Sequence, residues 1–195
     1  FGRPVVANLL LTKGAQVDAQ DDSGQTPLMI AALRGQTDIL KTLLAGKANS
    51  NLRDKKGRTA LSYASEQGPD AAVKLLLAAS ADPTVAVLES DGGATPLHFA
   101  VSRGSRESVK LLLEQGAKPN VAAVFGQAGV TPLILAASKN QRDIVALLLQ
   151  HQADPNLGDT KDNTPLLHAV GNRSAEVVRA LLAGGANPNS KNAAG

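Results

Sequence analysis

Runs of apolar residues return at regular intervals along this chain, and each of them predicts a helix. The spacing of three and four positions within a run is the one that gives a helix a single apolar face. Polar links and turns such as Asp22-Ser23-Gly24 follow the runs, so hairpin-like tips are expected between the helical units. The runs cover residues 5–11, 39–44, 73–77, 109–113, 144–149 and 177–182.

A shorter apolar segment precedes five of these runs and predicts a second helix in each unit. It starts with a Thr, and Pro follows the Thr in four of the five cases: Thr26, Thr59, Thr95, Thr131 and Thr164, which lie 33, 36, 36 and 33 residues apart. A Thr hydroxyl can accept a hydrogen bond from an amide of the first turn, and Pro is well suited to the first helical position. A period of this size indicates a stacked array of helical units.

Gly stands where three of the short helices should end, and Asn140 and Arg173 hold the matching places in the last two repeats. Asn tolerates a left-handed backbone, and Arg does so less well. We expect that conformation at Gly35, Gly68, Gly104, Asn140 and Arg173.

The motifs within this period resemble those of the ankyrin repeat family. Residues 95–100 read Thr-Pro-Leu-His-Phe-Ala, and Gly-Ala-x-Pro-Asn occurs at 116–120 and 185–189. The resemblance implies an all-α ankyrin-repeat solenoid of stacked helix-turn-helix units with hairpin fingers. One partial repeat and five full ones would form a single domain over residues 1–195. The partial repeat covers 1–24, and the full repeats start near residues 25, 58, 94, 130 and 163.

Four positions depart from the family pattern without changing the expected fold. Ala60 replaces the Pro of the second full repeat, and Lys47, Ser80 and Gln152 replace the family's Gly before the Ala of the motif. Slightly weaker helix stops are expected at these places.

Two neighbouring fingers are longer and more apolar than the others. The long fingers, residues 85–94 and 121–130, carry three extra residues each, whereas the ordinary fingers at 19–24, 52–57 and 157–162 are polar. Insertions in repeat arrays commonly lie on the binding face.

Apolar side chains at the tips of the long fingers are therefore candidate partner contacts. They are Val87, Leu88, Val124 and Phe125. Alternatively, the two fingers pack on each other and hide these side chains, although a paired tip could still present one face. If the tips are free, Asp at Leu88 and Phe125 should abolish binding with little change in melting temperature.

Positive charge is modest overall but unevenly placed. The formal net charge is +3, and Lys55, Lys56 and Arg58 surround one finger tip. Arg34, Arg103 and Lys139 occupy one equivalent place, the end of the first helix, in three repeats. The resemblance implies a concave groove lined by first helices and fingers, where these cations would hold an acidic and apolar segment of a partner protein. The alternative is a solvated face on which cations lie near helix C-termini, where the helix dipole favours them.

Nothing in the sequence indicates catalysis. There is no Cys, and no metal-binding His-Glu-x-x-His or phosphate-binding loop is present. His98, His151 and His168 fall in three different repeats or helices, too far apart to converge on one metal. The resemblance implies a structural role for His98, in hydrogen bonds between neighbouring repeats. We therefore expect no enzyme and no cofactor.

Three classes of function are compatible with such an array. The first is a monomeric, non-catalytic protein-binding scaffold, and the second is a substrate-targeting or regulatory arm of a larger multidomain protein or secreted effector. The third, a nucleic-acid binder, is disfavoured because there are few aromatic residues for stacking and no recognition-helix motif. The covered chain contains no transmembrane or signal segment. We therefore expect a cytoplasmic location and no membrane insertion.

Overall fold

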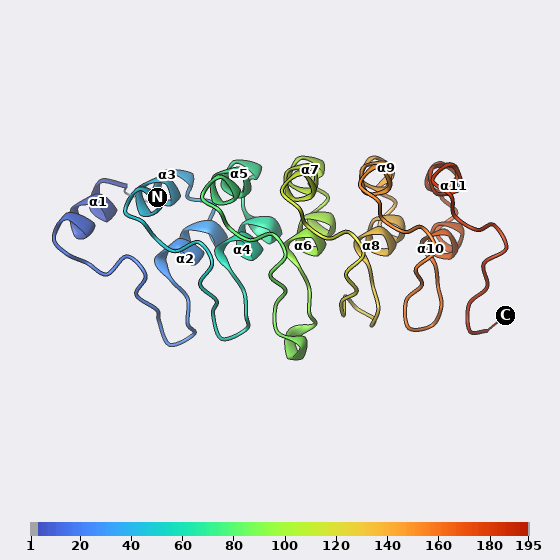
Figure 1. Ribbon diagram of the computed structural model, residues 1–195, viewed down its shortest axis with the longest axis horizontal. Coiled ribbons are helices and arrows are strands. Elements are labelled where there is room, and N and C mark those ends of the chain that lie inside the picture. The colour runs from blue at the N-terminus through green and yellow to red at the C-terminus, as the bar shows by residue number, and fades with distance from the viewer. Residues whose placement is uncertain (1–3, 195) are drawn as a thin grey trace.

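The computed structural model describes residues 4–194, so residues 1–3 and 195 of the expected domain lie outside the described residues. Figure 1 shows two rows of short helices with a row of loops projecting from one side. The inner row contains the first helix of each repeat: α2 (Pro27–Leu33), α4 (Ala60–Gln67), α6 (Pro96–Arg103), α8 (Pro132–Ser138) and α10 (Pro165–Gly171). The outer row contains α1 (Pro4–Thr12), α3 (Thr37–Ala45), α5 (Asp70–Ala78), α7 (Arg106–Glu114), α9 (Arg142–Gln150) and α11 (Ala175–Ala183).

Stacking of like helices on like helices builds the core. Each inner helix packs on the inner helices of the neighbouring repeats, and the outer helices do the same. One Leu of each helix from α2 to α9, and one of α11, is almost completely buried between the rows: Leu28, Leu61, Leu97, Leu133, Leu40, Leu76, Leu112, Leu148 and Leu181. Burial of one such side chain contributes about 1.5–3 kcal/mol. The all-α ankyrin-repeat solenoid is therefore confirmed, with a core that continues from repeat to repeat.

Threonine caps begin the inner helices, as the sequence predicts. The Thr26 hydroxyl accepts a hydrogen bond from Met29 N at 3.3 Å, and Thr131 accepts one from Ile134 N at 3.2 Å. Thr59 keeps its cap although Ala60 stands in place of Pro. The cap therefore fixes the start of the helix whether or not Pro follows it.

The expected left-handed helix ends are confirmed at four of the five positions. Gly35, Gly104, Asn140 and Arg173 have φ values of 64°, 79°, 58° and 56°. Gly68 is the exception, because its φ of −78° and ψ of 164° are extended. The residue that follows Gly68 is Pro69, and a proline ring disfavours helical backbone angles in the residue before it.

The left-handed conformation also occurs where the family's Gly is replaced. Lys47, Ser80 and Gln152 have φ values of 65°, 59° and 65°, beside 91° for Gly116 in the equivalent place. A side chain in that conformation costs about 1 kcal/mol. Packing of the neighbouring repeats thus imposes the same helix stop on residues that disfavour it.

Backbone hydrogen bonds join each finger to the next. Figure 1 shows the fingers as one continuous row: finger 1 (19–24), finger 2 (52–57), finger 3 (85–94), finger 4 (121–130) and finger 5 (157–162). A 3-10 helix, η1 (Glu89–Asp91), lies at the tip of finger 3. The bonds, written as acceptor and donor, are Ser23 O–Lys55 N, Lys56 O–Leu88 N, Gly92 O–Val124 N, Ala128 O–Thr160 N and Lys161 O–Ala193 N.

Candidate functional site

A cleft opens between the inner helices and the first two fingers. It has a volume of about 510 Å³ and is lined by residues of α2, α4, finger 1 and finger 2. Leu33 and Tyr63 give it apolar surface, whereas Lys55, Lys56 and Asp22 give it charge. We call the side of the fingers that contacts the inner helices the inner face, and this cleft lies on it.

A hydrogen-bond network fixes the floor of this cleft. Tyr63 Oη donates to Asp54 Oδ2 at 2.6 Å, and Gln25 Nε2, directly after finger 1, donates to Tyr63 Oη at 2.8 Å. Asp54 Oδ1 accepts from the backbone amides of Lys56 and Arg58, which shapes the tip of finger 2. Burial and the hydrogen bond to Asp54 raise the pKa of Tyr63 to about 12, so the phenol remains a neutral donor.

The same network recurs in the last repeats with other side chains. Asp159 Oδ2 lies 3.1 Å from His168 Nε2 and 2.5 Å from Gln127 Nε2, which comes from the preceding finger. Burial alone would raise the pKa of Asp159, but hydrogen bonds from Lys161, Asn163 and His168 lower it.

Sequence reasoning did not identify these two networks, although a signal was present. An Asp stands five residues before the Thr of three repeats, at Asp21, Asp54 and Asp159.

Arg58 is committed to contacts within the chain. Its guanidinium lies 2.6 Å from Glu66 Oε2, and its Cζ lies 5.2 Å from the ring centre of Tyr63 and 4.9 Å from that of Phe99. Only 21% of its side chain is exposed. Arg58 therefore ties the second full repeat to the third and offers a partner little free charge.

Arg103 also has a structural role. Its guanidinium donates to Asp70 Oδ1 at 2.5 Å and to Ser108 Oγ at 3.0 Å. Ser105 Oγ donates to the same carboxylate oxygen at 2.5 Å. Burial alone would raise the pKa of Asp70, but the two serines and Arg103 lower it. The expected ladder of cations is thus interrupted at its middle position.

The remaining candidate cations are exposed to solvent. Arg34 and Lys139 end α2 and α8, and Lys55 and Lys56 occupy the tip of finger 2. Lys139 Nζ donates to the backbone oxygen of Ser102 at 3.0 Å from an exposed position. Within residues 4–194, none of these four forms an ion pair.

The long fingers pack together and divide the four apolar candidates into two pairs. Val87 is 4% exposed and lies in a cluster with Ala94, Phe99 and Ala123. Phe125 is half-buried against this cluster, with its ring centre 6.2 Å from that of His98 and 6.1 Å from that of Phe99. Burial makes Val87 inaccessible, so it is removed from the proposed contact set.

Leu88 and Val124 remain exposed, at 43% and 55%. The long fingers therefore pair, through Gly92 O and Val124 N at 2.8 Å, without hiding these two side chains, and their contact with a partner stays a prediction.

This packing changes the outcome expected for the finger variants. Phe125→Asp should lower the free energy of unfolding by about 2 kcal/mol, because it places a carboxylate against His98 and Phe99. Leu88→Asp should change it by less than about 0.5 kcal/mol. Urea unfolding of the two single variants measures the difference, and equal losses would contradict this account of finger packing.

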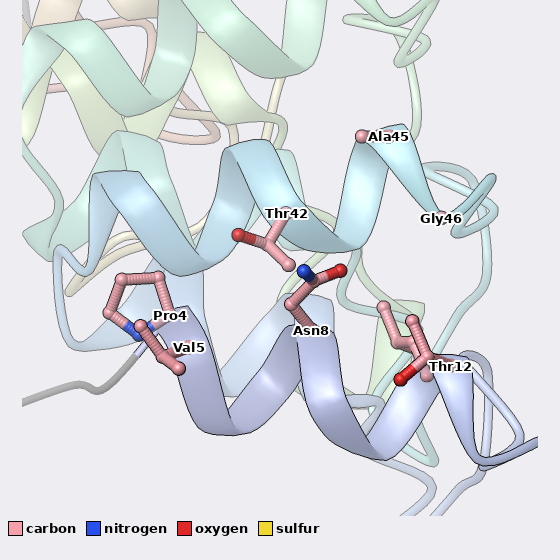
Figure 2. Close-up of a pocket in the computed structure, with 8 residues that line it drawn as sticks. Pro4, Val5, Asn8, Thr12, Thr42, Ala45 and Gly46 are labelled. Carbon is pink, nitrogen blue, oxygen red and sulfur yellow. The ribbon is translucent and has the colours of Figure 1, made fainter.

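A second hollow lies at the first helix of the stack. It has a volume of about 620 Å³, and Figure 2 shows it between α1 and α3, with Asn8 pointing from α1 toward Thr42. The other lining residues are Pro4, Val5, Leu11, Thr12, Ala45 and Gly46. No ionisable side chain is among these described residues.

Among residues 4–194, no helix is long and apolar enough to cross a membrane.

Comparison with known proteins agrees with this architecture. The family model described as "Ankyrin repeats (3 copies)" matches residues 1–87 and 123–192, and the model "Ankyrin repeat" matches residues 92–123. A segment of 48 residues is 46% identical to "Probable E3 ubiquitin-protein ligase XBOS31" of Oryza sativa subsp. japonica. That segment is 25% of this chain and covers 11% of the length of the rice protein. The family matches extend over most of the sequence, and the chain therefore belongs to the ankyrin repeat family.

Proposed function

We propose that this chain is a non-catalytic scaffold that binds another protein through its inner face and its two long fingers. Ankyrin repeats are generally protein–protein interaction modules. The observation that carries the proposal is the cleft between α2, α4 and the first two fingers, which combines apolar surface with exposed cations. In its simplest form the scaffold acts as a monomer.

Charge on the inner face favours a partner segment with acidic residues beside apolar ones. Lys55 lines the cleft, and Glu66 neutralises Arg58. Arg34 follows the lining residue Leu33 at the end of α2, and Lys139 holds the equivalent place at the end of α8. Asp22 and Asp54 are the carboxylates among the residues that line the cleft. Exposed charges of this kind contribute to the rate and selectivity of association more than to affinity. An acidic segment would therefore be steered toward the groove, and Leu33 and Tyr63 would supply apolar contact.

Charge reversal on the inner face tests this proposal. Peptides selected from a phage-displayed random library on the wild type should be acidic. Their affinity should fall about tenfold or more in a variant that combines Arg34→Glu, Lys55→Glu and Lys139→Glu, because each change replaces attraction by repulsion. Isothermal titration calorimetry at low and high salt measures the loss, which should shrink as salt screens the charges.

A matched control carries the same charge change on the outer helices. Lys74→Glu, Arg106→Glu and Arg179→Glu alter three exposed cations of α5, α7 and α11. The control variant should bind the selected peptides as the wild type does. An equal loss in both variants would show that net charge decides binding and would refute the groove.

A second candidate is that the segment is the substrate-targeting or regulatory arm of a larger multidomain protein or secreted effector. The match to a rice protein of which it covers 11% favours this candidate. Mass spectrometry of the intact protein from its source cells tests it. Peptides from outside the printed sequence would support the arm, and a full chain with none would contradict it.

A further inference from the structure

The exposed apolar residues of the long fingers lie on the opposite side of the finger row from the groove. Successive side chains of an extended segment point to opposite sides. Val87 and Ala123 pack on Phe99 of the inner helix α6, and are buried there. Their neighbours Leu88 and Val124 therefore face away from the inner helices. We call this side of fingers 2, 3 and 4 the outer side.

Arg53 shows the same alternation in finger 2. Its neighbour Asp54 is buried toward Tyr63 on the inner face. Arg53 instead donates to Ala86 O of finger 3 at 2.7 Å and to Gly57 O at 3.2 Å. The bond to Ala86 connects fingers 2 and 3, the bond to Gly57 lies within finger 2, and together they occupy the guanidinium with backbone oxygens.

A trough lies between fingers 3 and 4, and the buried Val87 and Ala123 line it together with residues of the outer side. Its volume is about 470 Å³, and small or aliphatic residues such as Ala86, Ala122 and Val124 line it together with Glu89. None of the described residues that line it carries a positive charge. Glu89 and Asp91 of η1 are exposed, and neither forms an ion pair within residues 4–194. The cation Lys56 is bonded to finger 3 through its backbone oxygen, which accepts from Leu88 N. It belongs to finger 2, however, and does not line the trough.

We propose that this trough is a second protein-docking surface, which holds an extended partner segment with an aliphatic residue next to Lys or Arg. The aliphatic side chain would lie against Ala122 and Val124, and the basic one would meet Glu89 and Asp91. The surface is thus opposite in charge preference to the inner face. This inference rests on the proposed protein-binding function, and gives the long fingers a partner chemistry of their own.

The proposal is tested with two short peptides with blocked termini. One alternates valine with lysine, and the other alternates valine with glutamate. Titrated into the isotope-labelled wild type, the lysine peptide should shift amide resonances of residues 86–93 and 122–124. Combined Glu89→Lys and Asp91→Lys changes should move the ratio of the two affinities by about tenfold toward the glutamate peptide. Val124→Ser should weaken the lysine peptide by removing the aliphatic wall. If both peptides shifted the resonances of residues 86–93 and 122–124 with equal affinity, or if the lysine peptide shifted only resonances elsewhere, the proposal would be overturned.

Control variants separate this surface from the groove. Glu107→Lys with Glu176→Lys makes the same charge change on α7 and α11 and should leave the peptide preference unchanged. The inner-face triple variant should still bind the lysine peptide at the trough. If the inner face selects no acidic peptide but the trough shifts appear, the groove fails alone. If the trough shifts are missing while acidic peptides bind the groove, the second surface fails alone.

Discussion

Acidification from pH 7.5 to pH 5 should remove about 2 kcal/mol of stability through His98 alone, since its pKa of about 4 in the folded chain lies well below the ordinary 6.5. Burial lowers the pKa of His98, and hydrogen bonds to Val130 and Val121 offset only part of that effect. The neutral ring fits its site. The backbone amide of Thr95 donates to Nδ1 at 3.2 Å, and Nε2 lies 3.1 Å from Val130 O. Protonation of Nδ1 would replace that acceptor by a donor facing the amide.

The direction follows from which state binds the proton more tightly. Between pH 6.5 and pH 4 the unfolded chain carries the proton on His98 and the folded chain does not, so stability falls as the pH falls. The contribution is complete above pH 6.5. Asp70, Asp82 and Asp159 have lowered pKa values, so their stabilising contributions are lost in a more acidic range.

His98→Gln separates the contribution of this histidine from all others. Urea unfolding at a series of pH values should show a lower but flatter stability for the variant between pH 7.5 and pH 5. The difference between the two curves should shrink by about 2 kcal/mol over that range. Parallel curves would show that His98 titrates normally in the folded chain.

Local patterns in the sequence carry most of the fold. Each Thr cap and each Leu run is an independent local signal, and the five copies reinforce one another. The wrong prediction at Gly68 has a local cause too, because the ring of the following Pro69 disfavours helical angles in the residue before it.

The candidate site was less predictable because its residues are used across repeats. Arg103 was expected to be free, yet it meets Asp70, which lies 33 positions earlier. Such pairs follow from the register of two stacked repeats, and not from any short pattern. Similarly, Val87 and Leu88 are adjacent and equally apolar, and only the contact with Phe99 decides which of them is buried.

Leu97→Ala should be among the most damaging single changes in the chain, at a cost of about 2–5 kcal/mol. Leu97 has no exposed surface and lies in α6, which packs on both α4 and α8. A cavity there weakens two repeat interfaces at once. Because each repeat is stabilised mainly by its neighbours, the array should then lose cooperativity between its halves. Urea unfolding followed by far-ultraviolet circular dichroism should show a broader transition with a smaller apparent m-value.

The same substitution at Leu181 distinguishes position in the stack from burial. Leu181 is equally buried, but it lies in α11, whose outer-row neighbour is α9. Leu181→Ala should therefore release mainly the last repeat, which hydrogen exchange would detect as lost protection in α10 and α11 while α2 to α7 remain protected. In Leu97→Ala the loss should centre on α4, α6 and α8. If both variants lost protection uniformly along the chain, the molecule would unfold as one unit and the nearest-neighbour description of its stability would be wrong.

If the two variants differ as expected, the inner face around fingers 1 and 2 retains its shape when the far end of the stack opens. Partner binding there could then be measured independently of the last repeat.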